Sequence, residues 1–165
     1  MKNWVLRNIP LVGIVCLLIL VTGCANNQAV ANKVISEIQK DVPFTLILPS
    51  YLPRGVRTIP AGINGPTVDE TDASVIVGIT YANSSEKFVD VTEENVNISW
   101  VPSHPYVIYN INGVEVMSQS TAIASATKIT NGFMCVWNKN GIHFEVAIYG
   151  YDQTEGKKVV ESMIK

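Results

Sequence analysis

Residues 133–148 read FMCVWNKNGIHFEVAI, and this stretch decides the fold. Its centre, Asn140-Gly141, is the dipeptide most typical of a two-residue type I′ turn between antiparallel strands. Such a turn pairs three couples of residues across the hairpin: Trp137 with Phe144, Cys135 with Val146, and Phe133 with Ile148. All of these residues are apolar or aromatic and share one face, which a slip of one residue would turn to water. The stretch therefore predicts a β-hairpin with one buried face.

A second hairpin is predicted by Asn112-Gly113, which also lies between apolar runs. Its turn pairs Ile111 with Val114, Tyr109 with Val116, and Val107 with Ser118. Apolar alternation indicates further strands. These are expected at Val75–Tyr81, followed by a polar hairpin loop at 82–86, and at Val96, Ile98 and Trp100.

Two other segments give weaker strand signals. Phe44, Leu46 and Leu48 alternate along the chain, and we expect a strand there. Residues 118–132 are rich in Ser, Thr and Ala, which favours a surface connection or a weak edge strand.

Two segments have apolar residues at helical spacing. A short helix is predicted from about Asn27 to Lys40, and it either lifts the domain off a membrane or packs against the domain. A second helix is predicted from about Thr154 to Ile164, with Thr154 as its N-cap. Its apolar stripe consists of Val159, Val160, Met163 and Ile164. We therefore expect an α+β fold: a twisted antiparallel sheet of about six to eight strands, a C-terminal helix packed on it, and an N-terminal helical tether.

Length and composition limit the class of protein. The chain has 165 residues, which is enough for one ordinary domain. With 47% hydrophobic and 16% charged residues it is not a disordered chain. The 12 basic and 14 acidic residues exclude the strongly basic surface of a nucleic-acid binder. The three cysteines are too few for a disulfide framework.

The first residues have the pattern of a targeting segment. Lys2 and Arg7 precede an uncharged aliphatic run from Ile9 to Val21. This run of about 13 residues is shorter than a membrane-spanning helix and matches the apolar region of a signal peptide. It ends in Val21-Thr22-Gly23-Cys24, which resembles the lipobox of bacterial lipoproteins. The resemblance implies cleavage before Cys24, lipidation of its thiol, and anchoring at the extracytoplasmic face of the cell membrane. The alternative is an uncleaved N-terminal anchor that contains a cysteine by chance.

Processing at Cys24 divides the chain into three parts. We expect a signal peptide at 1–23, a tether with a short helix at 24–43, and one α+β domain at 44–165. Loss of Lys2 and Arg7 lowers the basic count from 12 to 10, against 14 acidic residues, so the acyl chains are the whole anchor. Cys135 is then the remaining thiol, and its apolar strand favours a small buried hydrophobe over a catalytic nucleophile.

Few residues suggest chemistry. His143 and Glu145 share the strand face opposite Phe144, and with a third ligand such as His104 they could hold a metal. A zinc site usually has three or four clustered ligands, so we interpret this face as a solvated polar one. The acidic residues at 69–72 are interpreted as a solvated loop. No Gly-x-Ser-x-Gly motif and no phosphate-binding glycine loop is present. We therefore expect no catalytic residues, no cofactor and no metal.

Three tyrosines are candidate ligand-binding residues. Tyr106, Tyr149 and Tyr151 fall opposite or beyond the predicted apolar faces. As an exposed stripe they would bind a peptide, glycan or lipid. The alternative is that they cover the terminal helix or the second side of the sheet.

Four motifs in order resemble one family. They are Pro49-Ser50-Tyr51-Leu52-Pro53-Arg54-Gly55, Ile111-Asn112-Gly113-Val114-Glu115, Trp137-Asn138-Lys139-Asn140-Gly141-Ile142, and the closing helix with Val159-Val160-Glu161-Ser162. Together they resemble an uncharacterised C-terminal domain of Gram-positive lipoproteins and of membrane-anchored sigma-factor regulators. The same region is distantly similar to the C-terminal domain of a periplasmic protein that guards an anti-sigma factor. The resemblance implies a twisted antiparallel sheet with a helix on it and supplies no catalytic residues.

Two functions are therefore expected. The first is a non-enzymatic binding or sensing module of the cell envelope, related to envelope stress or sigma regulation, that binds an envelope protein or glycan. The second is a lipid-handling or envelope-assembly accessory lipoprotein, which requires an apolar groove between sheet and helix. A third function, hydrolysis, lacks the residues it needs.

Overall fold

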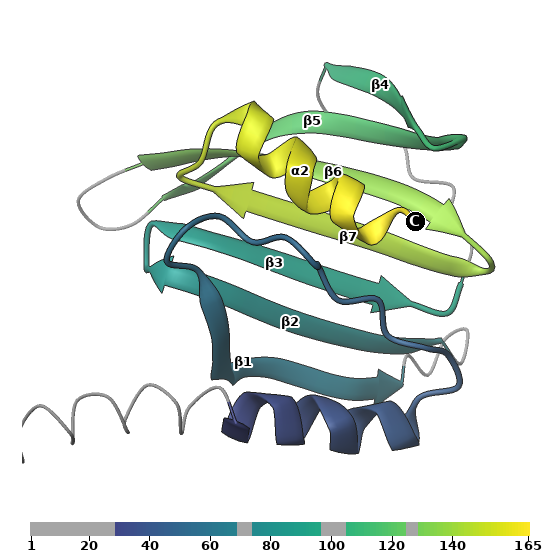
Figure 1. Cartoon of the computed structure of the whole chain (residues 1–165). Helices are drawn as coiled ribbons and strands as arrows, with labels where there is room; N and C mark the ends of the chain where they lie inside the picture. Colours follow the sequence, from purple (N-terminus) through teal and green to yellow (C-terminus); the bar gives the residue numbers. More distant parts are fainter. Residues whose placement is uncertain (1–28, 69–73, 97–104, 125–128) are drawn as a thin grey trace, which may run out of the picture.

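The computed structural model describes residues 29–68, 74–96, 105–124 and 129–165. A helix at residues 29–41 precedes seven strands and a C-terminal helix (Figure 1). These elements are β1 (Arg57–Val68), β2 (Val75–Ser84), β3 (Lys87–Glu94), β4 (Tyr106–Ile111), β5 (Val114–Ala124), β6 (Ile129–Lys139), β7 (Ile142–Tyr149) and α2 (Gln153–Met163). The strands form one sheet in the order β1-β2-β3-β7-β6-β5-β4, and every neighbouring pair is antiparallel. The α+β class and the antiparallel sheet are confirmed.

Both predicted hairpins are present in the predicted register. Trp137 pairs with Phe144 in the β6–β7 hairpin, and Tyr109 pairs with Val116 in the β4–β5 hairpin. Both turns adopt positive φ at both central residues, as a type I′ turn requires. The φ values are 51° at Asn112, 82° at Gly113, 54° at Asn140 and 77° at Gly141.

The core lies on one face of this sheet, which we call the helix face because α2 crosses it over β6 and β7 (Figure 1). Side chains on this face are almost completely removed from solvent. They include Val77, Val91, Val116, Phe144, Val146 and Ile148 from the strands, and Val159, Val160, Met163 and Ile164 from the C-terminal helix. The predicted apolar stripe of that helix is therefore confirmed.

The N-cap of α2 lies two residues before the predicted one. Asp152, rather than Thr154, is the N-cap, and its carboxylate accepts the backbone N–H of Glu155 at 2.9 Å. An aspartate before the first turn satisfies an otherwise unpaired N–H and complements the helix dipole, which explains the earlier start. Gly156 allows α2 to pack tightly against β6, since a Cβ at this position would lie 1.7 Å from the Phe133 ring.

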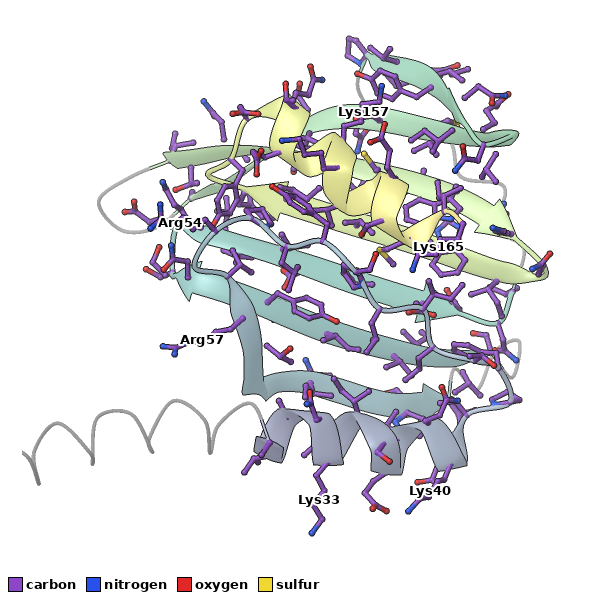
Figure 2. The ribbon with its side chains drawn as sticks, in the orientation of Figure 1. Lys33, Lys40, Arg54, Arg57, Lys157 and Lys165 are labelled. Atoms are coloured by element: carbon purple, nitrogen blue, oxygen red, sulfur yellow. The ribbon has the colours of Figure 1, made fainter. Side chains whose placement is uncertain are left out.

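The N-terminal helix packs on the domain instead of standing apart from it. It lies beside β1 at one edge of the sheet (Figure 1), and Ala31 and Ile38 are buried. Lys33 and Lys40 project away from the sheet on its outer side (Figure 2). This helix therefore covers the β1 edge, whereas β4 forms the other edge of the sheet.

The segment 42–56, which we call the strap, crosses the helix face in front of β2 and β3 (Figure 1). The strand predicted at 44–48 is wrong, because these residues have no regular secondary structure. Side chains, in place of a neighbouring strand, form hydrogen bonds with the backbone of the strap. Gln39 donates to the Phe44 carbonyl at 2.8 Å and accepts the Leu46 N–H at 2.9 Å. Glu93 accepts the Ile47 N–H.

Two strand assignments also differ from the prediction. Residues 118–124 and 129–132 belong to β5 and β6, which pair in register from Ser118↔Cys135 to Ala124↔Ile129. Both strands are inner strands of the sheet, so neither a surface connection nor an edge strand describes these residues. Strand β1 was not predicted, and its pairing with β2 is interrupted by two register shifts. The expected strand at 96–100, the acidic loop at 69–72 and the whole segment before residue 29 lie outside the described residues, apart from Val96.

Candidate ligand-binding site

The second face of the sheet, opposite α2, carries a recess at one end of β1, β2 and β3. Its volume is about 620 Å³, within the usual range of ligand pockets. Most of the lining residues have polar side chains, although apolar atoms form the larger part of the exposed wall: Arg57, Thr58, Thr80, Ala82, Asn83, Ser84, Ser85, Phe88, Asp90 and Ile123. Strand alternation places these side chains, because Phe88 and Asp90 alternate with the buried Val89 and Val91 of the helix face. Arg57 projects from the start of β1 (Figure 2).

Asp90 is the carboxylate of this recess. Burial raises its pKa, and a hydrogen bond with the Thr80 side chain partly opposes this effect. Its Oδ1 atom is buried and has no hydrogen-bond partner among the described residues. A buried polar atom without a partner is costly and is the kind of group that an ordered water or a ligand satisfies.

An aromatic pair adjoins the recess. The rings of Phe88 and Tyr149 are stacked, with centroids 4.7 Å apart and an interplanar angle of 30°. Phe88 lines the recess, and Tyr149, one of the predicted ligand-binding residues, supports it from the neighbouring strand. The recess therefore combines hydrogen-bonding groups with one aromatic surface.

The three candidate tyrosines do not form one stripe. Tyr106 is 49% exposed on the edge strand β4. It lies three strands from Tyr149, a separation of about 14 Å at the usual strand spacing. Tyr151 follows β7, packs against the core, and has the Lys87 ammonium 5.7 Å from its ring centroid. Their role in ligand binding stays a prediction.

His143 and Glu145 are less exposed to solvent than the sequence predicted. His143 is only 5% exposed, and its Nδ1 lies 2.9 Å from the Asn138 side-chain oxygen. Burial lowers the pKa of His143 and raises that of Glu145. Both residues lie on the face opposite Phe144, as predicted, and Glu145 is half-buried. The expectation that His143 is solvated is wrong, because β7 lies between β3 and β6, whose side chains flank it on both sides. No group of three or more His, Cys, Asp or Glu side chains able to hold a metal occurs in the described ranges, and His104 lies outside them.

A second recess lies on the helix face, between α2 and strands β4, β5 and β6. Its volume is about 300 Å³. Apolar residues form most of the lining: Tyr109, Ile111, Val116, Phe133, Cys135 and Val160, with Ser118, Gln153, Thr154 and Lys157 as the polar members. We call it the α2 groove.

Cys135 lies at the floor of this groove and is 4% exposed. Burial raises the pKa of its thiol to about 11, and the Ser118 side chain hydrogen-bonds to it. Such a thiol stays protonated near neutral pH and is a poor nucleophile. This environment fits the small buried hydrophobe that was predicted.

Neither the targeting segment nor Cys24 is among the described residues, so the predicted lipidation stays a prediction. Within the part of the chain that the structure describes, no helix is long and apolar enough to cross a membrane. Comparison with family models, curated protein sequences and solved structures finds no match to this chain.

Sequence reasoning missed the recess on the second face, although β3 contains a signal for it. The strand sequence Lys87-Phe88-Val89-Asp90-Val91 places an aromatic ring and a carboxylate on the side opposite two valines. An aromatic ring and a carboxylate side by side on the face opposite the core favour a ligand-binding surface over a merely solvated one. The other lining residues come from separate strands and become neighbours only in the folded sheet.

Proposed function

We propose that this protein is a lipoprotein, anchored through Cys24 at the extracytoplasmic face of the cell membrane, and that its domain is a non-enzymatic binding module of the envelope. The observation that carries the proposal is the recess on the second face, with Asp90 and Phe88 in its lining. Its size suits a small ligand or a few units of a polymer. The anchor rests on the lipobox at 21–24.

The lining favours a polar ligand that is rich in hydroxyl groups. Asn83, Ser84 and Thr80 supply donors and acceptors, and the Asp90 carboxylate accepts from hydroxyl or amine groups. The Phe88 ring offers an apolar surface on which the C–H face of a sugar packs. An envelope glycan combines these properties, so we propose a glycan as the ligand. A role in envelope stress or sigma regulation rests on the family resemblance alone.

Asp90→Asn tests this site on the full-length lipoprotein in membrane vesicles. Labelled glycan fragments purified from the cell envelope serve as the probe. Loss of one charge-assisted hydrogen bond should weaken binding by about tenfold to a hundredfold. Glu145→Gln is the matched control, because Glu145 shares the second face and is half-buried but does not line the recess.

Two outcomes would contradict the proposed site. Equal glycan binding by wild type and Asp90→Asn would show that the recess is not where the glycan binds. Equal weakening by Glu145→Gln would show that the effect comes from the sheet as a whole.

A second candidate function is favoured by the α2 groove. A lipid-handling lipoprotein needs an apolar site between sheet and helix, and this groove occupies that place. Its volume lies at the lower end of the range for ligand pockets, which favours a small apolar ligand over a whole phospholipid.

A further inference from the structure

The α2 groove exists because the C-terminal helix covers only part of the helix face. α2 crosses β6 and β7 and leaves the inner sides of β4 and β5 beside it (Figure 1). Val116 and Ile111 from these strands, together with Phe133 from β6, form the floor. The groove is thus a continuation of the core that no described segment fills.

The floor of the α2 groove consists of buried apolar side chains. Val116 is fully buried, and Cys135, Ile111 and Phe133 are each at least nine-tenths buried. Beyond the groove, Val107 is 52% exposed on the same face of β4 and extends the apolar surface toward the edge of the sheet.

One positive charge lies at the rim of the groove. The Lys157 ammonium lies 5.7 Å from the centroid of the Tyr109 ring, and both residues line the groove. Figure 2 shows Lys157 on the side of α2 that faces β4. Its ion pair with Glu161 is long, at 3.7 Å, and both side chains are about half exposed, so the pair is weak and leaves the ammonium available to an anion.

We propose that the α2 groove binds a medium-length acyl chain that ends in a carboxylate, with the chain against Val116 and Phe133 and the carboxylate at Lys157. The apolar floor supplies affinity through burial, and the ammonium selects an anionic end group. This proposal rests on the second candidate function and names its ligand. It is independent of the glycan recess, which lies on the other face.

Photo-crosslinking in membranes tests this proposal without detergent, which would compete for an apolar groove. Full-length lipoprotein in lipid vesicles is exposed to decanoic acid that carries a diazirine at its chain end, and to the matching alcohol and amine. Mass spectrometry then locates the labelled peptides. We expect labelling of the peptides that contain Val116 and Phe133 by the acid, and about tenfold less by the alcohol.

Three variants test the role of the charge. Lys157→Gln should lower labelling by the acid about tenfold, and Lys157→Glu should shift the preference to the amine. Lys158→Gln is the matched control, because Lys158 is the next residue of α2 but pairs with Glu155 and lies over Tyr51, away from the groove. It should label like wild type.

The outcomes separate this proposal from the proposed function. Labelling of groove peptides by acid and alcohol alike would show an apolar site without selection for a carboxylate and would overturn the role of Lys157. No labelling of groove peptides by any probe would overturn the site itself. Neither outcome affects glycan binding at Asp90, and membrane anchoring is measured separately by fractionation of the same vesicles.

Discussion

Glu93 on β3 accepts the backbone N–H of Ile47 through both of its carboxylate oxygens, at 3.0 and 3.1 Å. The two residues are 46 positions apart, and this contact fixes the strap to the helix face. Glu93 is only 1% exposed, and burial raises its pKa from 4.5 to about 7, although the Ile47 N–H favours the charged form. Burial, and to a lesser extent the charge of Glu93, raises the pKa of Tyr81 on the neighbouring strand β2. Because Glu93 is buried and titrates near neutral pH, the stability of the fold should depend on pH in this range.

The first prediction concerns the pH dependence of stability. Because the folded state raises the pKa of Glu93, it binds this proton more tightly than the unfolded state does, and the free energy of unfolding falls as the pH rises from about 4.5 to about 7. The loss from this group is about 3 kcal/mol. Glu93→Gln keeps an acceptor for Ile47 and should remove this part of the loss. Chemical denaturation at pH values on both sides of the window measures it.

The control for this prediction is Glu115→Gln on the exposed side of β5. It should keep the wild-type pH profile. Superimposable profiles for Glu93→Gln and wild type would show that Glu93 ionises in the folded state as it does in water.

The second prediction concerns the contact between Gly156 and Phe133. Alanine is the better helix former by about 1 kcal/mol, so Gly156→Ala would stabilise a helix that had free space. Its Cβ would instead meet the Phe133 ring at 1.7 Å, and overpacking of this kind costs about 1–3 kcal/mol. We expect a net loss of stability in thermal denaturation. In a Phe133→Leu background the loss should shrink, and an undiminished loss would place its cause elsewhere.

The third prediction concerns the start of α2. Asp152→Ala removes the N-cap acceptor of the Glu155 N–H and should lower the free energy of unfolding by about 1 kcal/mol. Asp152→Ser should restore most of it. Thr154→Ala, at the position that the sequence favoured, should change stability by less than about 0.5 kcal/mol. The opposite ranking of these alanine variants would contradict the assigned cap.

The hairpins and the apolar stripe of α2 were predictable because their signals are local. Asn140-Gly141 fixes a turn, and the alternation on each side has to agree with it. The strap could not be predicted in the same way. Its hydrogen-bond acceptors are side chains of Gln39 and Glu93, and Glu93 comes close only after β3 has joined the sheet.

Missed or misjudged elements have the same kind of cause. Pro60 and Pro66 interrupt the strand-like sequence of β1. The two register shifts in its pairing with β2 break the regular alternation of apolar and polar residues by which a strand is predicted. The burial of His143 follows from strand order, because β7 lies between β3 and β6. The candidate site draws on β1, β2, β3 and β5, so its composition depends on the topology of the sheet rather than on any single motif.

The proposed function depends first on where the chain is held. Mass spectrometry of the N-terminal peptide, from protein purified out of its own membrane fraction, tests this most directly. We expect a mature chain that begins at Cys24 with a thioether-linked diacylglyceryl group, and a Cys24→Ala variant that lacks the modification. A chain that still begins at Met1, with a free thiol at Cys24, would contradict it.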